Sequence, residues 1–567
     1  MTNTYNTLNP IGSTAPKDLC DNASNFDDFS LSPSPSFVDR LGKRRETISG
    51  MEVAFAQFLI NSGYQYTNPL VYQAGITITL PNQVFLKDGN YYRAGPTLSL
   101  PYVTTGVWAT EQALFTPIGD NVLRSDLAST DPAKGAAVVF GAIRYVTNLA
   151  ALKLLPKTGT KLANTLCWGS LGDGGAAQYR LDESDLTSTG DDFLTVVAND
   201  GGRWKLMHTG KVSLACAGVG VSSAMCTDRF NAAMAAVDAY GYPELYLPAG
   251  VTNIDGAGVT CSGRPVTLRG AGKGLSQIRY NGSDWALSIL PNDIQQNVTL
   301  SDFAIIPNNT SVASGRPLRV VYPTFASWSG KTVDICNLDL HSNLTGASLP
   351  YWAAGMYFNN AWNGVIRNVW FTGKANDWLT TASFIELGDN CTDFVIDSVH
   401  GNFCINWLAI TGYSEGVSVT NSTAVKVYRG VNQATASFLN LRFRGNHVNA
   451  VATCFSMNNA AQNSIVDNLL YLTDAASVSF ANFAACNSGN YSNNICISTG
   501  NTTADGFSFS AGALQNKIIG NNFEGCATGI LLAPGTSANR AALNTRFVAG
   551  VQGPGVDDNG TGNTVTV

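Results

Sequence analysis

The sequence predicts a mainly β protein in which a β-solenoid follows a small α+β domain and a neck. Of its 567 residues, 45% are hydrophobic, only 13% are charged, and 56 are glycine. This composition suits short strands joined by many tight turns. In addition, short apolar strands that end in Asn or Asp recur through the second half of the chain. A repeat in the twenties with β-type residues is typical of a solenoid, in which each coil buries its apolar side against its neighbours.

The repeat can be followed by one polar residue per coil. Taking these residues as markers, the spacing between successive coils runs from 22 to 31 residues. We expect their side chains to stack, so that amides bond along the ladder and hold a sharp turn while Val, Ile, Leu and Phe fill the interior. The markers are Asn337, Asn368, Asp397, Asn421, Asn446, Asn468, Asn494, Asn521 and Asn544.

Residues 1–115 are predicted to form the small α+β domain. The polar stretch 18–28 is expected to be turn-rich. Residues 46–62 are predicted to form a helix, because Met51, Phe55 and Phe58 recur at helical spacing. Apolar runs at 76–80 and 84–86, and a further run that starts at 91, are predicted to be strands.

Residues 116–210 are predicted to be the neck, and residues 211–567 the solenoid. In the neck, the glycines of an Asp-Gly-Gly turn are expected to take positive φ, and Trp204 and Leu206 are expected to face inward from the strand that follows. Residues 228–240 are predicted to form an amphipathic helix that caps the open end of the solenoid.

Composition also argues against several classes of protein. A net charge of −6 with a pI near 5.3 disfavours nucleic-acid binding, which needs a basic face. No apolar run is long enough to span a membrane, and the first residues do not resemble a signal peptide. The twelve cysteines form no Cys-x-x-Cys pair, and none of the four histidines lies at metal-ligand spacing from one. We therefore expect reduced thiols that act as small apolar fillers, with neither a metal nor a cofactor.

Several segments resemble known phage proteins. Residues 34–50 and 55–64 resemble the virion-binding head of tailspikes of short-tailed bacteriophages, and residues 123–129 with Gly135 and Ala136 resemble a connector of phage tail fibres and spikes. Residues 172–179 and 200–208 resemble a module that often precedes the β-helix of such spikes. Residues 245–250 and 266–272 resemble the opening of a pectate-lyase-like right-handed parallel β-helix.

This resemblance implies where the protein acts and with what. It implies a homotrimer in the virion tail, made in the host cytoplasm without a signal peptide. Residues 1–115 would bind a tail adaptor or hub protein. The right-handed β-helix would bind and depolymerise a bacterial surface polysaccharide such as O-antigen or capsule.

Longer coils predict where a sugar would bind. The coils that end at Asn368 and Asp397 are longer than most later ones, and extra residues must leave a solenoid as loops. Two loops are expected, around 341–353 and 371–381. Their aromatic rings can match the C–H faces of sugars. The candidate sugar-binding residues are Tyr351, Trp352, Trp362, Trp378 and Tyr413.

Glycoside hydrolysis needs a pair of carboxylates, one as acid and one as base or nucleophile. In the strand around residue 386, Ile385 and Leu387 fit the interior, so Phe384 and Glu386 are expected to point outward. Glu386 and Asp389 lead the candidate catalytic residues, with Asp377 and Glu415 behind them.

The type of reaction, and whether the protein is an enzyme at all, stay open. Carboxylates one coil apart suit a retaining enzyme and wider pairs an inverting one. A polysaccharide lyase would instead use a base beside an arginine, for which His400 and Arg367 are the suggestive pair. A non-catalytic adhesin or a rigid structural rod could have the same fold, although Trp-rich inserted loops disfavour the rod.

Overall fold

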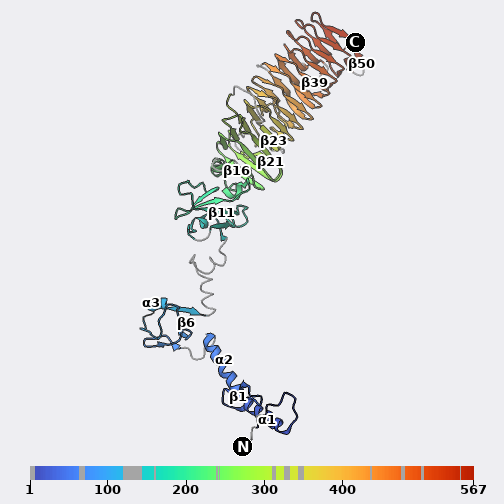
Figure 1. The fold of residues 1–567 in the computed structure, drawn as a ribbon. Coiled ribbons are helices and arrows are strands. Elements are labelled where there is room, and N and C mark those ends of the chain that lie inside the picture. The colour runs from blue at the N-terminus through green and yellow to red at the C-terminus, as the bar shows by residue number, and fades with distance from the viewer. Residues whose placement is uncertain are drawn as a thin grey trace. The chain divides into compact units, whose positions relative to one another are not determined.

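A computed structural model gives the structure in two compact units, residues 1–141 and 142–567. The coils of the second unit follow one another from green to red in Figure 1. The residues that the structure describes are 5, 7–62, 70–118, 143–158, 161–237, 241, 243–309, 315–324, 333–342, 350–433, 437–473, 479–499, 503–548, 551–553 and 555–566.

The first unit begins with two helices. The turn-rich prediction for residues 18–28 is wrong, because helix α1 (Pro16–Leu31) includes this stretch. Proline in the first turn has the φ that a helix needs, and Asp18 in that turn suits the positive end of the helix dipole. Helix α2 (Ile48–Ser62) confirms the helix predicted for residues 46–62. Its apolar side chains, however, are exposed: Phe55 is 61% and Phe58 63% exposed.

The strands of the first unit confirm an α+β domain. Phe85, Ile78 and Phe115 form its core, and the hydroxyls of Tyr72 and Tyr102 donate to the buried carboxylate of Glu111. The strands are β1 (Ser36–Val38), β2 (Arg44–Glu46), β3 (Leu70–Val71), β4 (Thr77–Ile78), β5 (Phe85–Lys87), β6 (Asn90–Ala94), β7 (Tyr102–Val103) and β8 (Phe115–Ile118), with the short helices α3 (Trp108–Glu111) and η1 (Gln112–Leu114).

The described part of the neck is a five-stranded sheet of order β12-β13-β11-β10-β9. Trp204 and Leu206 are buried as predicted, and Gly174 and Gly201 have positive φ. The sheet shares one hydrophobic core with the coils, so this part of the neck belongs to the solenoid unit. Its elements are β9 (Arg144–Val146), α6 (Leu149–Lys153), β10 (Leu162–Thr165), β11 (Ala177–Asp182), β12 (Thr195–Val197) and β13 (Arg203–Leu206).

Helix α7 (Thr227–Ala236) packs on the first coil, as predicted for residues 228–240, of which 238–240 lie outside the described residues. Phe230, Met234 and Val237 are buried. The side chain of Asn231 bonds to the backbone of Gly258 and Thr260, which ties the helix to that coil. Helix η2 (Leu214–Ala217) and β14 (Lys211–Ser213) precede α7.

The second unit confirms the predicted parallel β-solenoid, which has about 11 turns. Each strand pairs in parallel with the strand that occupies the same face one coil later, as in β25–β29–β33–β36. The short strands β28, β32, β35 and β38 form a separate parallel ladder, and β50 pairs antiparallel with β49.

The strands after β14 have the following bounds: β15 (Glu244–Tyr246), β16 (Gly250–Asp255), β17 (Val259–Ser262), β18 (Val266–Arg269), β19 (Ser276–Asn281), β20 (Trp285–Leu290), β21 (Val298–Pro307), β22 (Arg316–Val321), β23 (Val333–His341), β24 (Met356–Asn359), β25 (Val365–Arg367), β26 (Trp370–Thr372), β27 (Ser383–Leu387), β28 (Cys391–Thr392), β29 (Val395–Asp397), β30 (His400–Asn402), β31 (Asn406–Ile410), β32 (Ser414–Glu415), β33 (Ser418–Thr420), β34 (Thr423–Gln433), β35 (Phe438–Leu439), β36 (Arg442–Arg444), β37 (His447–Asn458), β38 (Ala460–Ala461), β39 (Ser464–Val466), β40 (Leu469–Leu472), β41 (Ser479–Ala484), β42 (Asn490–Ser492), β43 (Ile495–Ser498), β44 (Asp505–Phe509), β45 (Lys517–Ile519), β46 (Asn522–Glu524), β47 (Thr528–Leu532), β48 (Arg540–Ala542), β49 (Thr545–Val548), β50 (Val551–Gly553), β51 (Val556–Asp558) and β52 (Thr564–Thr566).

One corner of the solenoid is built from residues with positive φ, which end the strand and turn the chain. The strand pairings place one such residue at this corner in ten successive coils. The predicted markers do not all lie in this row, because Asp397 precedes it and the markers from Asn446 onward follow it by one residue. The row is Asp302, Asn337, Asn368, Ser398, Asn421, Gly445, Asp467, Asn493, Gly520 and Leu543.

The later markers form the predicted amide ladder inside the solenoid. Asn468 donates from Nδ2 to Oδ1 of Asn494 over 2.9 Å, and Asn494 donates in the same way to Asn521 over 2.9 Å. Each Oδ1 also accepts the backbone N–H of the preceding coil, as Asn494 does from Asn468 over 3.1 Å. A second ladder, which the sequence markers missed, joins Asn516, Asn539 and Asn563 at another corner.

Ten of the twelve cysteines are buried, and none is paired, which confirms their predicted role as apolar fillers. Cys20 is exposed and Cys336 is half-buried. In the part of the chain that the structure describes, no helix is long and apolar enough to cross a membrane.

We expect Asn494→Ala to lower the free energy of unfolding of the coils by about 1–3 kcal/mol, because it leaves the buried Asn468 N–H and the Ile465 carbonyl without their partner. Asn482→Ala, at an exposed position of β41, is the matched control and should change little. Urea denaturation followed by circular dichroism measures both. Equal effects in the two variants would contradict a stabilising role for the ladder.

Candidate functional site

Glu386 lies on a face of the solenoid that we call the β27 face, formed by β24, β27, β31 and the second half of β34. Its in-register neighbour is Tyr357, one coil earlier. The hydroxyl of Thr411 donates to Glu386 Oε1 over 3.3 Å. Burial, together with the charges of Glu386 and Asp389, raises the pKa of Tyr357. Glu386 is half-buried and faces outward, as predicted.

Asp389 follows Glu386 by three residues, after β27 ends, and Glu415 lies on β32 of the next coil. Asp389 is exposed, and its Oδ1 accepts the backbone N–H of Tyr413 over 3.2 Å. The Tyr413 hydroxyl donates to Glu415 Oε2 over 3.1 Å, and burial together with this bond raises the pKa of Tyr413. We call Glu386, Asp389 and Glu415 the acidic cluster. Three of the four predicted carboxylates therefore lie on two consecutive coils and share Tyr357 and Tyr413 as neighbours.

The fourth carboxylate, Asp377, is held by its own loop between β26 and β27. It forms a 2.9 Å ion pair with Lys374 and accepts hydrogen bonds from the hydroxyl of Thr380 and the N–H of Leu379. The hydrogen bond from Thr380, which has the largest effect, and the hydrogen bond from Lys374 lower the pKa of Asp377 to about 2. With its oxygens already bonded and its charge fixed, Asp377 orders the loop and is not part of the acidic cluster.

The structure buries two of the predicted sugar-binding tryptophans. Trp352 is fully buried and stacks near Tyr280, with ring centroids 6.5 Å apart, and Trp362 is 4% exposed. The expectation that they face the solvent is wrong, because both rings are buried in the core of the solenoid. Tyr351 and Trp378 are half-buried, Lys374 lies 5.4 Å from the Tyr351 ring, and Tyr413 is 39% exposed. Of the expected loop 341–353, residues 343–349 lie outside the described residues.

Phe384 is also buried, although alternation along the strand predicted that it would point outward. It stacks on Phe371 with ring centroids 4.5 Å apart and contacts Trp407 edge-on at 6.1 Å. Trp407 is its in-register neighbour and is buried as well. At this corner two successive residues point inward, so alternation holds only along the straight part of the strand.

A groove that the sequence analysis did not assign lies on the next face of the solenoid. This face, which we call the β26 face, is formed by the end of β23, β26, β30 and the start of β34. A hollow of about 520 Å³ on it shares His341 with an adjoining hollow of about 400 Å³. The in-register rows of the first hollow are Asp339, Trp370, His400 and Thr423, and His341, Thr372, Asn402 and Val425. We call the two hollows together the Trp370 groove.

Charged and aromatic groups line the Trp370 groove. The indole of Trp370 is 53% exposed, with the His400 ring 5.2 Å away and Lys273 Nζ 5.4 Å from the indole centroid. Asp339 Oδ1 lies 2.9 Å from His341 Nδ1, and this hydrogen bond raises the pKa of His341. Burial, followed by the charge of Lys273, lowers the pKa of His400.

The sequence contained a signal that could have located this groove. Trp370, His400 and Thr423 each lie two residues after the positive-φ residue of their coil, as Asp339 does after Asn337. The sequence analysis used Asp397, not Ser398, as the marker of its coil. This error of one residue put His400 out of register with Trp370 and Thr423. Arg367, which the lyase alternative pairs with His400, lies on the preceding strand β25, 3.8 Å from Asp334.

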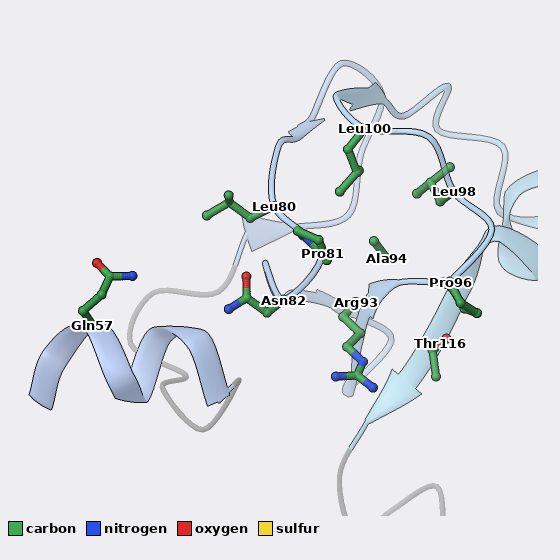
Figure 2. Close-up of a pocket in the computed structure, with 11 residues that line it drawn as sticks. Gln57, Leu80, Pro81, Asn82, Arg93, Ala94, Pro96, Leu98, Leu100 and Thr116 are labelled. Atoms are coloured by element: carbon green, nitrogen blue, oxygen red, sulfur yellow. The ribbon is translucent and has the colours of Figure 1, made fainter. Parts of the chain in front are cut away.

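The first unit has a hollow of its own, shown in Figure 2. Leu98, Leu100 and Ala94 contribute apolar surface there, and Arg93 and Thr116 come from the paired strands β6 and β8. None of the predicted catalytic or sugar-binding residues lines it. Among the described residues, no group of three or more His, Cys, Asp or Glu side chains is arranged to hold a metal ion.

No protein-family model matches the sequence, and no curated protein matches it. Three solved structures share part of its fold at low identity. The enzymatically active domain of tailspike protein 2 of bacteriophage CBA120 is 13% identical, with a TM-score of 0.44, over 71% of this chain and 55% of that one.

The tailspike of Acinetobacter baumannii phage AM24 is 12% identical, with a TM-score of 0.45, over 73% of this chain and 68% of that one. The mannuronan C-5 epimerase A-module of Azotobacter vinelandii is 14% identical, with a TM-score of 0.45, over 63% of this chain and 98% of that one. At these TM-scores we base neither a site nor an activity on the similarity.

The histidines of the β26 face are expected to titrate in a defined order. His341 should titrate above 6.5 because of Asp339, whereas His400 and His447 should titrate below 6.5 because of burial. NMR of histidine-labelled protein measures the three midpoints, and Asp339→Asn should lower that of His341.

The sign of the effect on stability follows from the raised pKa of His341. The Asp339–His341 pair stabilises the fold fully below pH 6.5, and this contribution is lost as the pH rises through the pKa of the folded state. A His341 midpoint at or below that of His400 would contradict the assigned pair.

Proposed function

We propose that this chain is a tailspike of a short-tailed bacteriophage that binds a bacterial surface polysaccharide, O-antigen or capsule, and depolymerises it by hydrolysis. The resemblance of residues 34–64 to tailspike heads supports attachment to the virion tail. The observation that carries the enzymatic part is the acidic cluster: Glu386, Asp389 and Glu415 lie on two stacked coils, with Tyr357 in register with Glu386 and the Tyr413 hydroxyl bonded to Glu415.

The geometry fits the chemistry of glycoside hydrolysis. One carboxyl group protonates the leaving oxygen, while a second carboxylate activates a water or attacks the sugar itself. Glu386 and Asp389 lie three residues apart on one coil, and Glu415 lies on the next coil, where strands are spaced by about 4.8 Å. Glu386 is more buried than Asp389 and is assigned as the acid, with Asp389 as base or nucleophile. The hydroxyls of Tyr357 and Tyr413 are placed to bond sugar hydroxyls.

Glu386→Gln and Asp389→Asn should each lower the rate of polysaccharide cleavage at least 100-fold, because a catalytic carboxyl acts mainly in the transition state. Binding of the same polysaccharide should change little. Release of reducing ends and surface plasmon resonance measure the two effects. Absorbance near 235 nm distinguishes hydrolysis from a lyase reaction.

Glu524→Gln, which changes an exposed carboxylate of a later coil, is the matched control and should cleave like the parent protein. Full activity in both Glu386→Gln and Asp389→Asn would remove the acidic cluster from the mechanism. Binding without cleavage by the parent protein would indicate an adhesin.

We propose that the assembled protein is a homotrimer and that the first unit attaches it to a tail adaptor or hub protein. Helix α2 supports self-association, since Met51, Val53, Phe55 and Phe58 are all at least 45% exposed in the single chain. An isolated helix that is apolar around its circumference needs a covering surface in water.

Sedimentation equilibrium of the full chain should therefore give three times the 60.0 kDa chain mass. Removing residues 1–118 should leave a protein that binds host cells but does not enter virions. A monomeric full chain would contradict the trimer, and incorporation of the truncated chain into virions would contradict attachment through the first unit.

A further inference from the structure

We infer that the Trp370 groove is a second saccharide-binding site, separate from the acidic cluster, and that it takes an acidic sugar residue such as a uronic or sialic acid. This inference rests on the proposed function, because it takes the ligand to be part of the same polysaccharide. It assigns the groove to binding, whereas cleavage takes place at the acidic cluster on the β27 face.

Trp370 provides the surface against which a sugar can stack. Large apolar side chains are normally covered, yet Trp370 is 53% exposed in a groove of about 520 Å³. Its ring lies next to His400, which in turn bonds Thr423 Oγ1 over 2.6 Å. The imidazole therefore supports the indole from the next coil, and a rigid aromatic ring loses little entropy when a ligand binds.

Polar side chains line the groove beside the ring. Thr372 and Asn402 lie in register at its floor, on β26 and β30. The Oδ1 atom of Asn402 is buried and has no hydrogen-bond partner among the described residues. Hydroxyl and amide groups beside an exposed aromatic ring form the combination that recognises a sugar, which is apolar on its faces and polar around its edge.

The charges around the groove favour an anion. Lys273 lies over Trp370, and Arg279 lines the adjoining hollow. The one carboxylate among the described lining residues, Asp339, is paired with His341. The fixed charge that a ligand meets is therefore positive, although the whole chain carries −6.

The groove and the acidic cluster are different places on the same coils. Trp370 belongs to β26 and Glu386 to β27, and the loop 373–382, held by the Lys374–Asp377 pair, connects these strands. A polymer has many identical repeats, so one chain can occupy both sites at once. Binding at the groove then raises the effective concentration of the next repeats near the carboxylates.

The test is an array of bacterial oligosaccharides, some with uronic or sialic acid and others neutral, probed with the full-length chain and its variants. The parent protein should bind acidic members. Trp370→Ala should weaken this binding at least tenfold and Lys273→Gln about threefold. The matched control is Tyr471→Ala, because Tyr471 also contacts a histidine on this face, His447, at 5.5 Å but lies outside the groove. Tyr471→Ala should bind like the parent protein.

Several results would overturn the inference: binding only to neutral members, binding to none, or equal affinity for the parent protein and Trp370→Ala. The inference would also be overturned if Trp370→Ala still bound a short oligosaccharide but no longer cleaved it, because the groove would then take part in catalysis. Thermal melting shows whether Trp370→Ala folds as Tyr471→Ala does. Because the array measures binding alone, it gives its result even if the acidic cluster proves inactive.

Discussion

The parallel register between successive coils determines everything else about the second unit. Each coil turns at the same corner through a residue of positive φ, and the strands that follow pair one above another. A buried side chain that accepts the backbone N–H of the preceding coil reinforces this register, as Asn446, Asn468, Asn494 and Asn521 do in turn. A slip of one residue would bury the outward-facing Glu386 and expose Ile385, so the register also fixes what the surface displays.

Much of the fold could be predicted from the sequence because solenoid coils repeat the same local pattern. The short apolar strands, the inward Ile385 and Leu387, and the capping helix with Phe230 and Met234 all follow from periodicity. Helix α1 was missed because Asp, Asn and Ser, which favour turns, make up much of the stretch. The strand alternation failed at Phe384, where the chain bends and two successive side chains enter the core.

The candidate site could be predicted only in part, and the reason is again register. Glu386 and Asp389 follow from their places relative to apolar neighbours, and the structure has both, together with Glu415, on two consecutive coils. The Trp370 groove depends on comparing positions 23 to 31 residues apart without error, which a single misplaced marker at Asp397 prevents. Burial of Trp352 could not be predicted, because the sequence does not show which of the aromatic rings between residues 328 and 378 point into the core.

The two faces have complementary chemistry. The β27 face ends in carboxylates with tyrosine hydroxyls beside them, which suits bond cleavage. The β26 face presents an exposed indole with cations nearby, which suits holding an anionic polymer. A rigid solenoid keeps the two faces at a fixed separation along the same coils, which is what the proposed binding and cleavage of one long polysaccharide require.

The most direct test of this account is a crystal structure of Glu386→Gln with an oligosaccharide obtained from the host polysaccharide. The account predicts sugar residues on the outer face of the coils between 333 and 433, with one ring next to Glu386 and Asp389. An oligosaccharide bound only along the later coils, or only on the first unit, would contradict the claim that stacking of these coils builds the functional site.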